Sequence, residues 1–164
     1  MDIQPQQRKG VICFLQRDER YLLAHIAYSE TDKKWSGIGG FVNEDETLTM
    51  AVAREIREEI DAEVVQESLQ HVGKIIENNE LTLHIFIATE WIGEIKSNEP
   101  SIIDLQWFTE HDVPYDEMWS DNAYWLPEIL SGKIIVATVL RDIYTDIKPL
   151  TERDVEIREV AEIT

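Results

Sequence analysis

A short apolar segment near the middle of the N-terminal half contains an unusual number of glycines. The segment 36–42 reads as a strand, yet it includes Gly37, Gly39 and Gly40. Glycines within a strand indicate either the close approach of another group to the backbone or dihedral angles that other residues avoid. We therefore predict a short strand whose backbone is approached closely or is locally irregular.

The helix predicted after this strand carries a cluster of carboxylates. Thr47 can cap it, and the pattern continues to about Ile60. At about 100° per residue, Glu55, Glu58 and Glu59 fall within an arc of about 100°, beside an apolar face. Like charges at this spacing repel one another by a few tenths of a kcal/mol, so a shared pocket needs compensation. Hard oxygen ligands of this kind suit Mg²⁺, although a solvated acidic face would produce the same cluster.

The composition limits the classes of function. The chain has 164 residues, of which 15 are basic and 33 acidic, and its net charge is −18. This length predicts one domain, residues 1–164, and the 43% hydrophobic content excludes collagen-like and fully disordered chains. Binding to a nucleic-acid polymer through a basic surface is disfavoured. An anionic substrate would instead need a local cation, most simply a bound divalent metal ion.

The compartment is predicted from features near the N-terminus. Cys13 lies in an apolar run and is the single cysteine, so we expect a buried, inert thiol. No segment has the roughly 20 apolar residues that span a bilayer, and residues 1–5 lack the pattern of a signal peptide. We therefore predict a cytoplasmic protein that does not interact with membranes.

The remaining pattern mixes strands and helices without a regular βαβ alternation, which predicts an α+β fold. We expect a hairpin that turns at Asn78-Asn79, and a short helix at 122–130 with Pro127 near its first turn. Residues 145–164 could close the sheet or form a contact surface, and the sequence leaves both open. The other predicted elements are strands at 9–15, 21–27, 70–77, 81–91, 103–108, 134–140 and 155–160, and a loop at 29–34.

The spacing around the acidic helix resembles the Nudix box, G-x5-E-x7-R-E-U-x-E-E-x-G-U, where U is apolar. Here Gly40 is followed by five residues, Glu46, seven residues, and then the run 54–59, Arg-Glu-Ile-Arg-Glu-Glu. The final glycine of the box is Asp61, which we expect to affect how the helix ends rather than metal binding. The resemblance implies an α/β/α sandwich with a mixed central sheet, and hydrolysis of a diphosphate linkage with Mg²⁺ or Mn²⁺.

The resemblance also implies roles for individual residues. Glu55, Glu58 and Glu59 would bind the metal ion together with the carbonyl oxygen of Gly40, and a glutamate of the box could act as general base. Arg54 would belong to the catalytic group by pairing with Glu46 and orienting the carboxylates. Glu99, in a later loop, would be a further acidic ligand or base, or else a solvated loop acid.

A second resemblance concerns the substrate. The segments 34–40, 106–108 and 116–127 are similar to those of MutT-like enzymes that hydrolyse oxidised purine nucleoside triphosphates, the 8-oxo-dGTP diphosphatases. It implies base stacking on Trp119, with Trp125 as a second candidate. Asp121 would accept from the N–H edge of a guanine-type base, and Asn122 would donate and accept. Both tryptophans could instead be packing residues.

Two departures from these relatives bear on the nucleobase. Ser36, expected with Gly39 to contact the substrate, replaces an asparagine, and Ile26 replaces a lysine. His25 and His84 are predicted to be structural, and Trp91 and Trp107 to be packing residues.

These observations predict a Mg²⁺-dependent Nudix hydrolase that converts a purine nucleoside triphosphate, such as 8-oxo-dGTP, to the monophosphate and pyrophosphate. It would act on a small nucleotide as a monomer or homodimer. The alternatives are a Nudix hydrolase for a nucleotide sugar or dinucleotide, a catalytically silent nucleotide-binding module, and an acidic interaction domain without metal dependence.

Overall fold

The computed structural model describes residues 8–140 and 150–164 of the chain. The strands are β1 (Arg8–Arg17), β2 (Arg20–Ala27), β3 (Lys33–Ser36), β4 (Ile38–Phe41), β5 (Glu63–Val64), β6 (Gln70–Glu77), β7 (Leu81–Ala88), β8 (Trp91–Ile92), β9 (Ile102–Thr109), β10 (Ile135–Val139) and β11 (Val155–Glu159). The helices are α1 (Leu48–Ile60) and α2 (Asn122–Leu130), with 3₁₀ turns at Gln66–Ser68, Tyr115–Glu117 and Glu152–Asp154.

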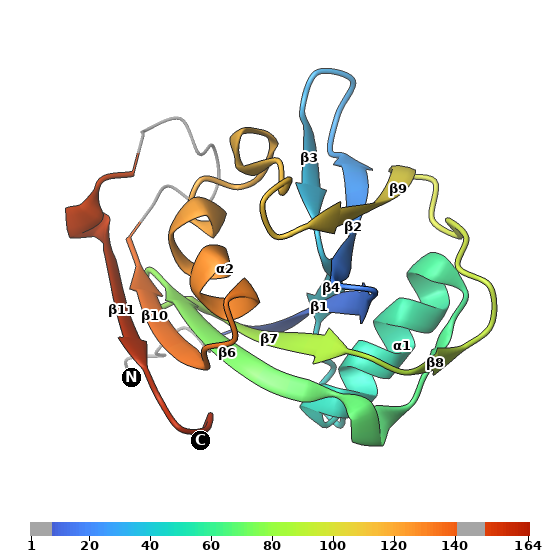
Figure 1. Cartoon of the computed structure of the whole chain (residues 1–164), viewed down its shortest axis with the longest axis horizontal. Coiled ribbons are helices and arrows are strands. Elements are labelled where there is room, and N and C mark those ends of the chain that lie inside the picture. The colour runs from blue at the N-terminus through green and yellow to red at the C-terminus, as the bar shows by residue number, and fades with distance from the viewer. Residues whose placement is uncertain (1–7, 141–149) are drawn as a thin grey trace, which may run out of the picture.

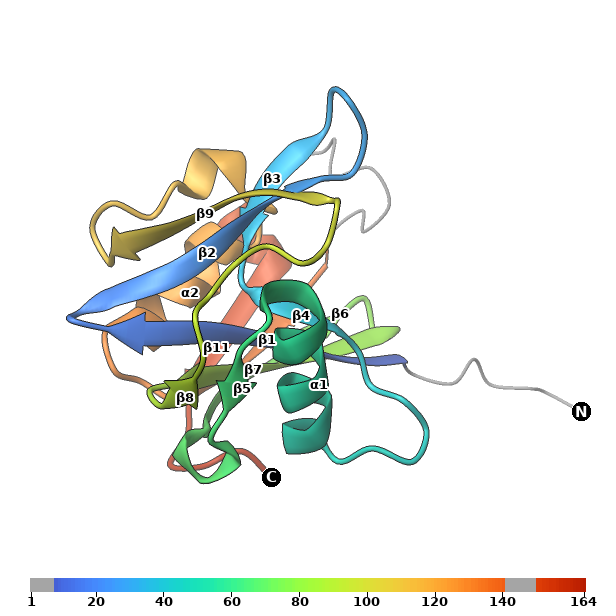
Figure 2. The ribbon, with the colours of Figure 1, turned by 90° about the vertical axis from the view of Figure 1, so that its right-hand side faces the viewer.

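Nine of the described strands form one mixed sheet in the order β11-β10-β6-β7-β1-β2-β3, with β4 paired to β1 and β9 paired to β2. The pairs β1–β7 and β6–β10 are parallel, and the other pairs in this sheet are antiparallel. Helices α1 and α2 pack on different sides of it (Figures 1 and 2). This arrangement confirms the predicted α+β class with a mixed sheet.

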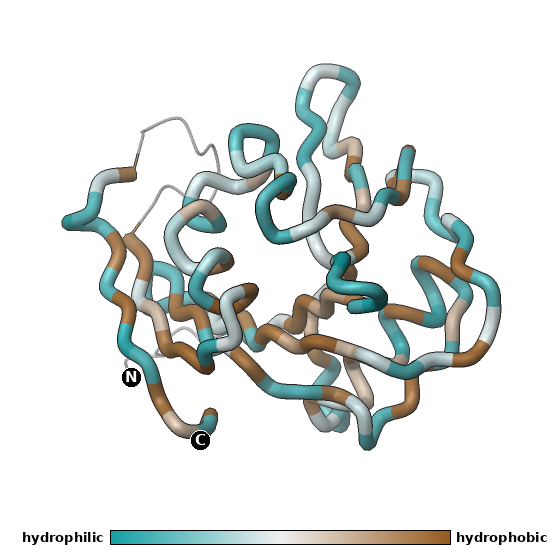
Figure 3. Tube along the Cα trace, in the orientation of Figure 1, coloured by the Kyte–Doolittle hydropathy of each residue, from teal (hydrophilic) through white to brown (hydrophobic). Residues whose placement is uncertain are grey.

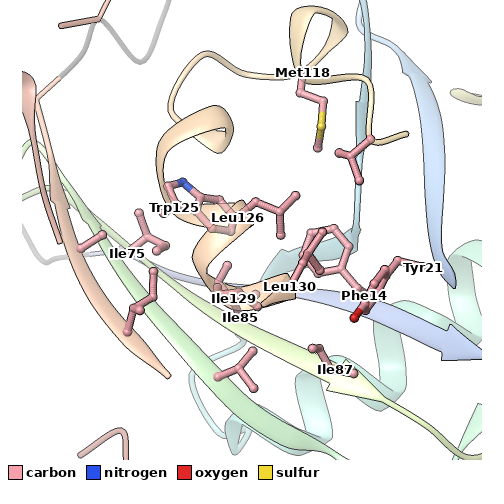
Figure 4. Packing of buried hydrophobic residues seen from close by; sticks show 14 of the residues in the cluster. Phe14, Tyr21, Ile75, Ile85, Ile87, Met118, Trp125, Leu126, Ile129 and Leu130 are labelled. Atoms are coloured by element: carbon pink, nitrogen blue, oxygen red, sulfur yellow. The ribbon is translucent and has the colours of Figure 1, made fainter. Parts of the chain in front are cut away.

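Alternation along the strands creates two cores on opposite faces of the sheet. Phe14 packs in the core that includes α2, whereas its neighbours Cys13 and Leu15 pack in the core that includes α1. Figure 4 shows α2 contributing Trp125 and Leu126 to the first of these cores. The apolar residues concentrate along the strands of the sheet, and polar residues dominate the loops at its ends (Figure 3). The sheet thus separates the core packed against α1 from the core packed against α2.

The cysteine, the two histidines and the two tryptophans predicted to be structural are buried or stacked on other rings. Cys13 is fully buried, which confirms that prediction, and burial raises the pKa of its thiol. His84 is also buried, and His25 stacks on Trp35 with ring centroids 4.4 Å apart. The indoles of Trp91 and Trp107 stack on each other at 6.0 Å, beside the guanidinium of Arg17. No helix in the described part of the chain is long and apolar enough to cross a membrane.

Some predicted boundaries are wrong. The strand predicted at 36–42 is interrupted at Gly37, because β3 ends at Ser36 and β4 begins at Ile38. The backbone is approached closely at this point, since a Cβ added at Gly37 would lie only 3.1 Å from the carbonyl oxygen of Cys13. The predicted loop at 29–34 overlaps the start of β3.

The strand predicted at 81–91 ends at Ala88, because Trp91 pairs with Val64 in a separate small sheet. Pro127 lies inside α2 rather than in its first turn. Of the C-terminal segment 145–164, residues 145–149 lie outside the described residues, and β11 extends the sheet by pairing with β10 and forms its edge.

Candidate active site

The start of α1 is fixed by local hydrogen bonds, as the sequence predicts. Thr47 caps the helix, since its Oγ1 accepts from the backbone N–H of Met50 at 3.2 Å. Just before it, Glu46 Oε1 accepts from the N–H of Asn43 at 2.9 Å. The loop between β4 and α1 is therefore tied to the helix that carries the three glutamates.

The end of α1 is defined by Asp61, the residue that replaces the final glycine of the box. Asp61 adopts the left-handed conformation (φ 58°, ψ 34°), and its N–H donates to the carbonyl of Arg57. Lys96 pairs with the Asp61 carboxylate at 3.3 Å. The substitution thus leaves the helix terminus in place, because an aspartate tolerates this conformation better than most residues.

The loop between β8 and β9 satisfies the last carbonyls of the helix. The N–H of Lys96 donates to Ile60 O at 3.1 Å, and the N–H of Asn98 donates to Glu59 O at 2.8 Å. Glu99 follows directly in the chain and is exposed. Helix α1 therefore holds this loop, and with it Glu99, close to its own C-terminal turn.

Arg54 lies among the acidic side chains and neutralises several of them. Its Nε and Nη2 donate to the two carboxylate oxygens of Glu46 at 2.7 and 2.9 Å, and its Nη1 donates to Glu55 Oε1 at 2.7 Å. A further Nη1 contact reaches Glu58 Oε2 at 3.3 Å, and Nη2 donates to the carbonyl of Phe41 at 2.9 Å. These bonds lower the pKa of the Glu46 carboxyl. The structure thus brings Arg54 and Glu46 together as expected.

Glu59 is the most strongly perturbed of the three glutamates. Burial first, and then the negative charge of Glu55, raise its pKa to about 8, and the charges of Glu99 and Glu58 act in the same direction. In the described part of the chain, its Oε2 is buried and has no hydrogen-bond partner. A buried carboxylate in this state is stabilised by a cation.

These residues fit a divalent metal ion. All of the donors are hard oxygens, and the orphaned Oε2 of Glu59 lacks the positive partner that an ion supplies. Glu55 lies against Gly40, where an added Cβ would collide with its carboxylate. No group of three or more ligating side chains is already gathered among residues 8–140 and 150–164. Arg54 holds Glu55, and the side chain of Glu58 is 59% exposed. Binding of a metal ion would therefore require the side chains of Glu55 and Glu58 to turn toward the ion.

A cavity of about 380 Å³ lies on the other side of the sheet, the side of α2. It contains the five residues predicted to contact substrate, which the sequence placed in two distant segments. Its lining also includes Gly40, whose backbone borders Glu55 on the opposite side. The predicted substrate residues in the lining are Ser36, Gly39, Trp119, Asp121 and Asn122.

The two tryptophans of the segment 116–127 have different environments. Trp119 lines the cavity and is half-buried, whereas Trp125 is 1% exposed in the core. The indole N–H of Trp125 donates to Asp121 Oδ2 at 2.7 Å. Trp125 therefore acts as a packing residue that fixes Asp121, and stacking on it is excluded by its burial.

Comparison with known proteins agrees with this geometry. A model of the NUDIX domain matches residues 6–129. The chain belongs to the NUDIX domain family.

Two sequence relatives and one solved structure show what the chain is similar to. The NUDIX chain is 33% identical over 105 residues to the oxidized purine nucleoside triphosphate hydrolase of Danio rerio, covering 61% of this chain and 65% of that protein. It is 30% identical over 111 residues to the NAD-capped RNA hydrolase NudC of Pseudomonas fluorescens, covering 67% and 39%. The MutT protein of Bacillus halodurans has the same fold, with a TM-score of 0.72 and 19% identity over 92% of this chain and 97% of that chain. The chain thus spans less than two thirds of the two curated relatives.

Three features of the NUDIX site are not evident from the sequence. Tyr28 lines the cavity and lies edge-on to Trp119 at 5.5 Å, and its hydroxyl accepts the indole N–H at 3.3 Å. The ammonium of Lys34 lies 4.6 Å from the Trp119 ring centroid and pairs with Asp32. Glu77 forms part of the cavity wall. Tyr28 and Lys34 lie on the two arms of the β2–β3 hairpin and contact the distant Trp119, and no local pattern marks Tyr28, Lys34 or Glu77.

A second cavity, of about 720 Å³, adjoins the first at Phe41 and lies beside the loop before α1. Arg8 and Lys9 line it, together with Glu46. The Arg8 guanidinium lies 3.8 Å above the ring centroid of Phe41. In a chain with net charge −18, two cations of β1 thus lie beside β4, the strand that borders both the first cavity and Glu55.

Proposed function

We propose that this NUDIX chain is a divalent-metal-dependent hydrolase that cleaves a purine nucleoside triphosphate, preferentially an oxidised one such as 8-oxo-dGTP, to the monophosphate and pyrophosphate. The observation that carries this proposal is the position of β4. Gly39 and Gly40 line the cavity with Trp119 and Asp121, and the same strand contacts Glu55 of α1. A nucleotide with its base in the cavity would therefore direct its phosphates past these glycines toward α1.

The side chains of α1 have distinct tasks in this proposal. Glu55, Glu58 and Glu59 would hold Mg²⁺, or Mn²⁺ in its place, with the carbonyl of Gly40. Such an ion, when bound, neutralises phosphate oxygens and lowers the pKa of water. Arg54 holds Glu55 in place through its 2.7 Å bond.

Water would attack the phosphorus on one side of the oxygen that bridges the α- and β-phosphates, that P–O bond would break, and the product on the other side would leave with the electron pair of the bond. The proton of the water passes to a carboxylate. Glu58 suits this role better than Glu55, because it is more exposed and is held by Arg54 only at 3.3 Å. Glu99 is a further acidic group whose charge acts on Glu59.

Base recognition would come from the cavity wall. The face of Trp119 offers stacking worth about 1–3 kcal/mol per base, and Tyr28 and Lys34 hold that indole in place. Asn122 can donate a hydrogen bond without taking up a proton. We therefore expect substrate affinity to change little between about pH 6 and 9, and a steep loss on one side of this range would contradict the role of Asn122.

A dinucleotide substrate is the second candidate, and the 30% identity to the NAD-capped RNA hydrolase supports it. The acidic net charge of −18 supports a small substrate rather than a nucleic-acid polymer or a membrane surface. We place this activity in the cytoplasm, with the protein as a monomer or homodimer.

A substrate panel with and without Mg²⁺ tests the proposal. It compares 8-oxo-dGTP, 2-oxo-dATP, unmodified dNTPs, nucleotide sugars, NAD and dinucleoside polyphosphates, with products identified as monophosphate and pyrophosphate. The oxidised purine triphosphates should have the highest kcat/KM. Glu58→Gln should lower kcat at least about a hundredfold, whereas the exposed Glu67→Gln should leave it unchanged. A nucleotide sugar or dinucleotide as best substrate, or turnover without a metal ion, would refute the proposal.

A further inference from the structure

Tyr28 is an exposed aromatic side chain that forms part of the cavity wall. It follows β2 directly and is 49% exposed. The large apolar side chains that the described residues leave exposed are Tyr28, Phe41, Met50, Ile92, Ile103 and Leu140. Of these, Tyr28 and Phe41 line the cavity together with Trp119, and Tyr28 is the one that carries a polar atom. A ligand in the cavity can therefore reach the Tyr28 hydroxyl.

The hydroxyl of Tyr28 is held at one edge of the Trp119 indole. The indole Nε1–H donates to it at 3.3 Å, and the two rings meet edge-on, with centroids 5.5 Å apart and an interplanar angle of 70°. The backbone of Tyr28 is fixed as well, since its N–H donates to the carbonyl of Asp32 at 2.8 Å in the turn between β2 and β3. The Tyr28 ring thus has a defined position beside Trp119 before any ligand binds.

The bond with Trp119 leaves the Tyr28 hydroxyl with a proton to donate. A phenolic hydroxyl both donates and accepts, whereas an indole N–H only donates. Tyr28 is therefore the acceptor in this bond, and its own proton points elsewhere. Within residues 8–140 and 150–164, no further hydrogen bond or ion pair uses that proton. Accepting from the indole also polarises the hydroxyl, which makes it a better donor.

A base stacked on Trp119 brings its edge to this donor. The ammonium of Lys34 lies over the Trp119 ring, yet Lys34 is not among the residues that line the cavity. The side of the indole that faces the cavity is thus left for a base to stack on. Because the Tyr28 hydroxyl lies at the edge of the indole, it meets the edge of a stacked base rather than its face.

The purine that this donor favours follows from the groups that accept a hydrogen bond. Guanine presents the acceptors N7 and O6 along one edge, with a C–H group at C8. In 8-oxoguanine a carbonyl oxygen replaces the hydrogen at C8, and N7 carries a proton. Both bases have O6, so the oxygen at C8 is the acceptor that only the oxidised base offers. A hydroxyl donor beside C8 therefore distinguishes the two bases.

We propose that Tyr28 is a specificity-determining residue whose hydroxyl donates a hydrogen bond to the C8 carbonyl of an 8-oxopurine stacked on Trp119. This inference rests on the proposed function, since it requires a purine nucleotide in the cavity. It assigns the preference for an oxidised base to a side chain of the β2–β3 hairpin, outside the segment that carries Trp119.

The test compares the binding of dGMP and 8-oxo-dGMP, which differ only at C8 and N7. Isothermal titration calorimetry with Mg²⁺ present measures both dissociation constants, and neither ligand contains the bond to be cleaved. The unaltered chain should bind the oxidised nucleotide more tightly. Tyr28→Phe keeps the ring beside Trp119 and removes the donor, so it should lower this preference about three- to tenfold, as expected for one hydrogen bond between neutral groups.

Tyr124→Phe is the matched control. It also removes one hydroxyl, which donates to the carbonyl of Leu150 at 3.0 Å, and Tyr124 is not part of the cavity lining. This variant should leave the preference unchanged. Thermal melting curves of both variants check that the fold is retained.

Each alternative outcome has a definite meaning. If Tyr28→Phe weakens the binding of both nucleotides by the same factor, Tyr28 only supports Trp119 and the inference is wrong. The inference is also wrong if Tyr28→Phe leaves the preference unchanged, or if the unaltered chain binds the two nucleotides equally. Failure of the unaltered chain to bind either nucleotide would instead refute the proposed function.

Discussion

Arg54 offers the sharpest test of how the acidic site is held together before any ligand binds. The substitution Arg54→Gln removes the cation that bonds to Glu46 through two nitrogens and to Glu55 through a third. The side chains of Arg54, Glu46 and Glu55 are 21%, 13% and 12% exposed, respectively. The variant therefore leaves two mostly buried carboxylates without their principal partner.

The expected loss of stability lies between two known limits. Exposed ion pairs contribute about 0.2–1 kcal/mol, and removing one partner of a fully buried pair costs about 3–5 kcal/mol. For this partly buried cluster we expect the free energy of unfolding to fall by about 2 kcal/mol. In a chain of this size that corresponds to a decrease in Tm of about 4–8 °C.

Urea denaturation and calorimetry, both without metal ions or nucleotide, measure this effect. Arg57→Gln is the matched control, because Arg57 lies on the same helix and pairs with Glu63 while both side chains are more than half exposed. It should cost about 0.5 kcal/mol or less. Equal destabilisation by the two variants would show that Arg54 does not stabilise the acidic cluster, and would refute this reasoning.

Two further predictions concern other parts of the molecule. Burial, with the nearby charges of His71, Lys74 and Lys9, lowers the pKa of His84 to about 4, so the unfolded chain binds more protons between about pH 6.5 and 4. The free energy of unfolding should therefore decrease as the pH is lowered through this range. Between pH 7 and 5 the unaltered chain should lose about 1–2 kcal/mol more than the His84→Gln variant does, and parallel pH profiles of the two proteins would contradict this. Arg8→Gln should raise the KM for a triphosphate about three- to tenfold at low salt, whereas Arg20→Gln should not, and equal KM values for all three proteins would exclude a phosphate contact at Arg8.

Local interactions explain which features could be predicted from the sequence. The cap at Thr47 and the three- and four-residue spacing of the glutamates depend on residues close in the chain, so α1 and its acidic side were predicted correctly. The hairpin between β6 and β7 follows from Asn78 and Asn79, which both adopt positive φ as such a turn requires. The substrate residues were predicted by resemblance to a family, and the structure gathers them in the lining of one cavity.

Features that depend on pairing between distant segments could not be predicted. Glu77 follows an apolar run and looks like a solvated strand end, and only its pairing with β7 and β10 places it in the cavity wall. Trp125 resembles a stacking residue in sequence, yet the packing of α2 on the sheet buries it. The break at Gly37 depends on the approach of Cys13 and its neighbours in β1.

The location of the two cores has a consequence for how this protein can evolve. The glutamates and the cavity lined by Trp119 are on opposite sides of a sheet, and the short strand β4 borders both. Substitutions on one side that share no contacts with those on the other should combine additively in free energy. If the proposed function is correct, new nucleobase preferences can therefore be acquired through the α2 side while the hydrolytic residues of α1 are inherited intact.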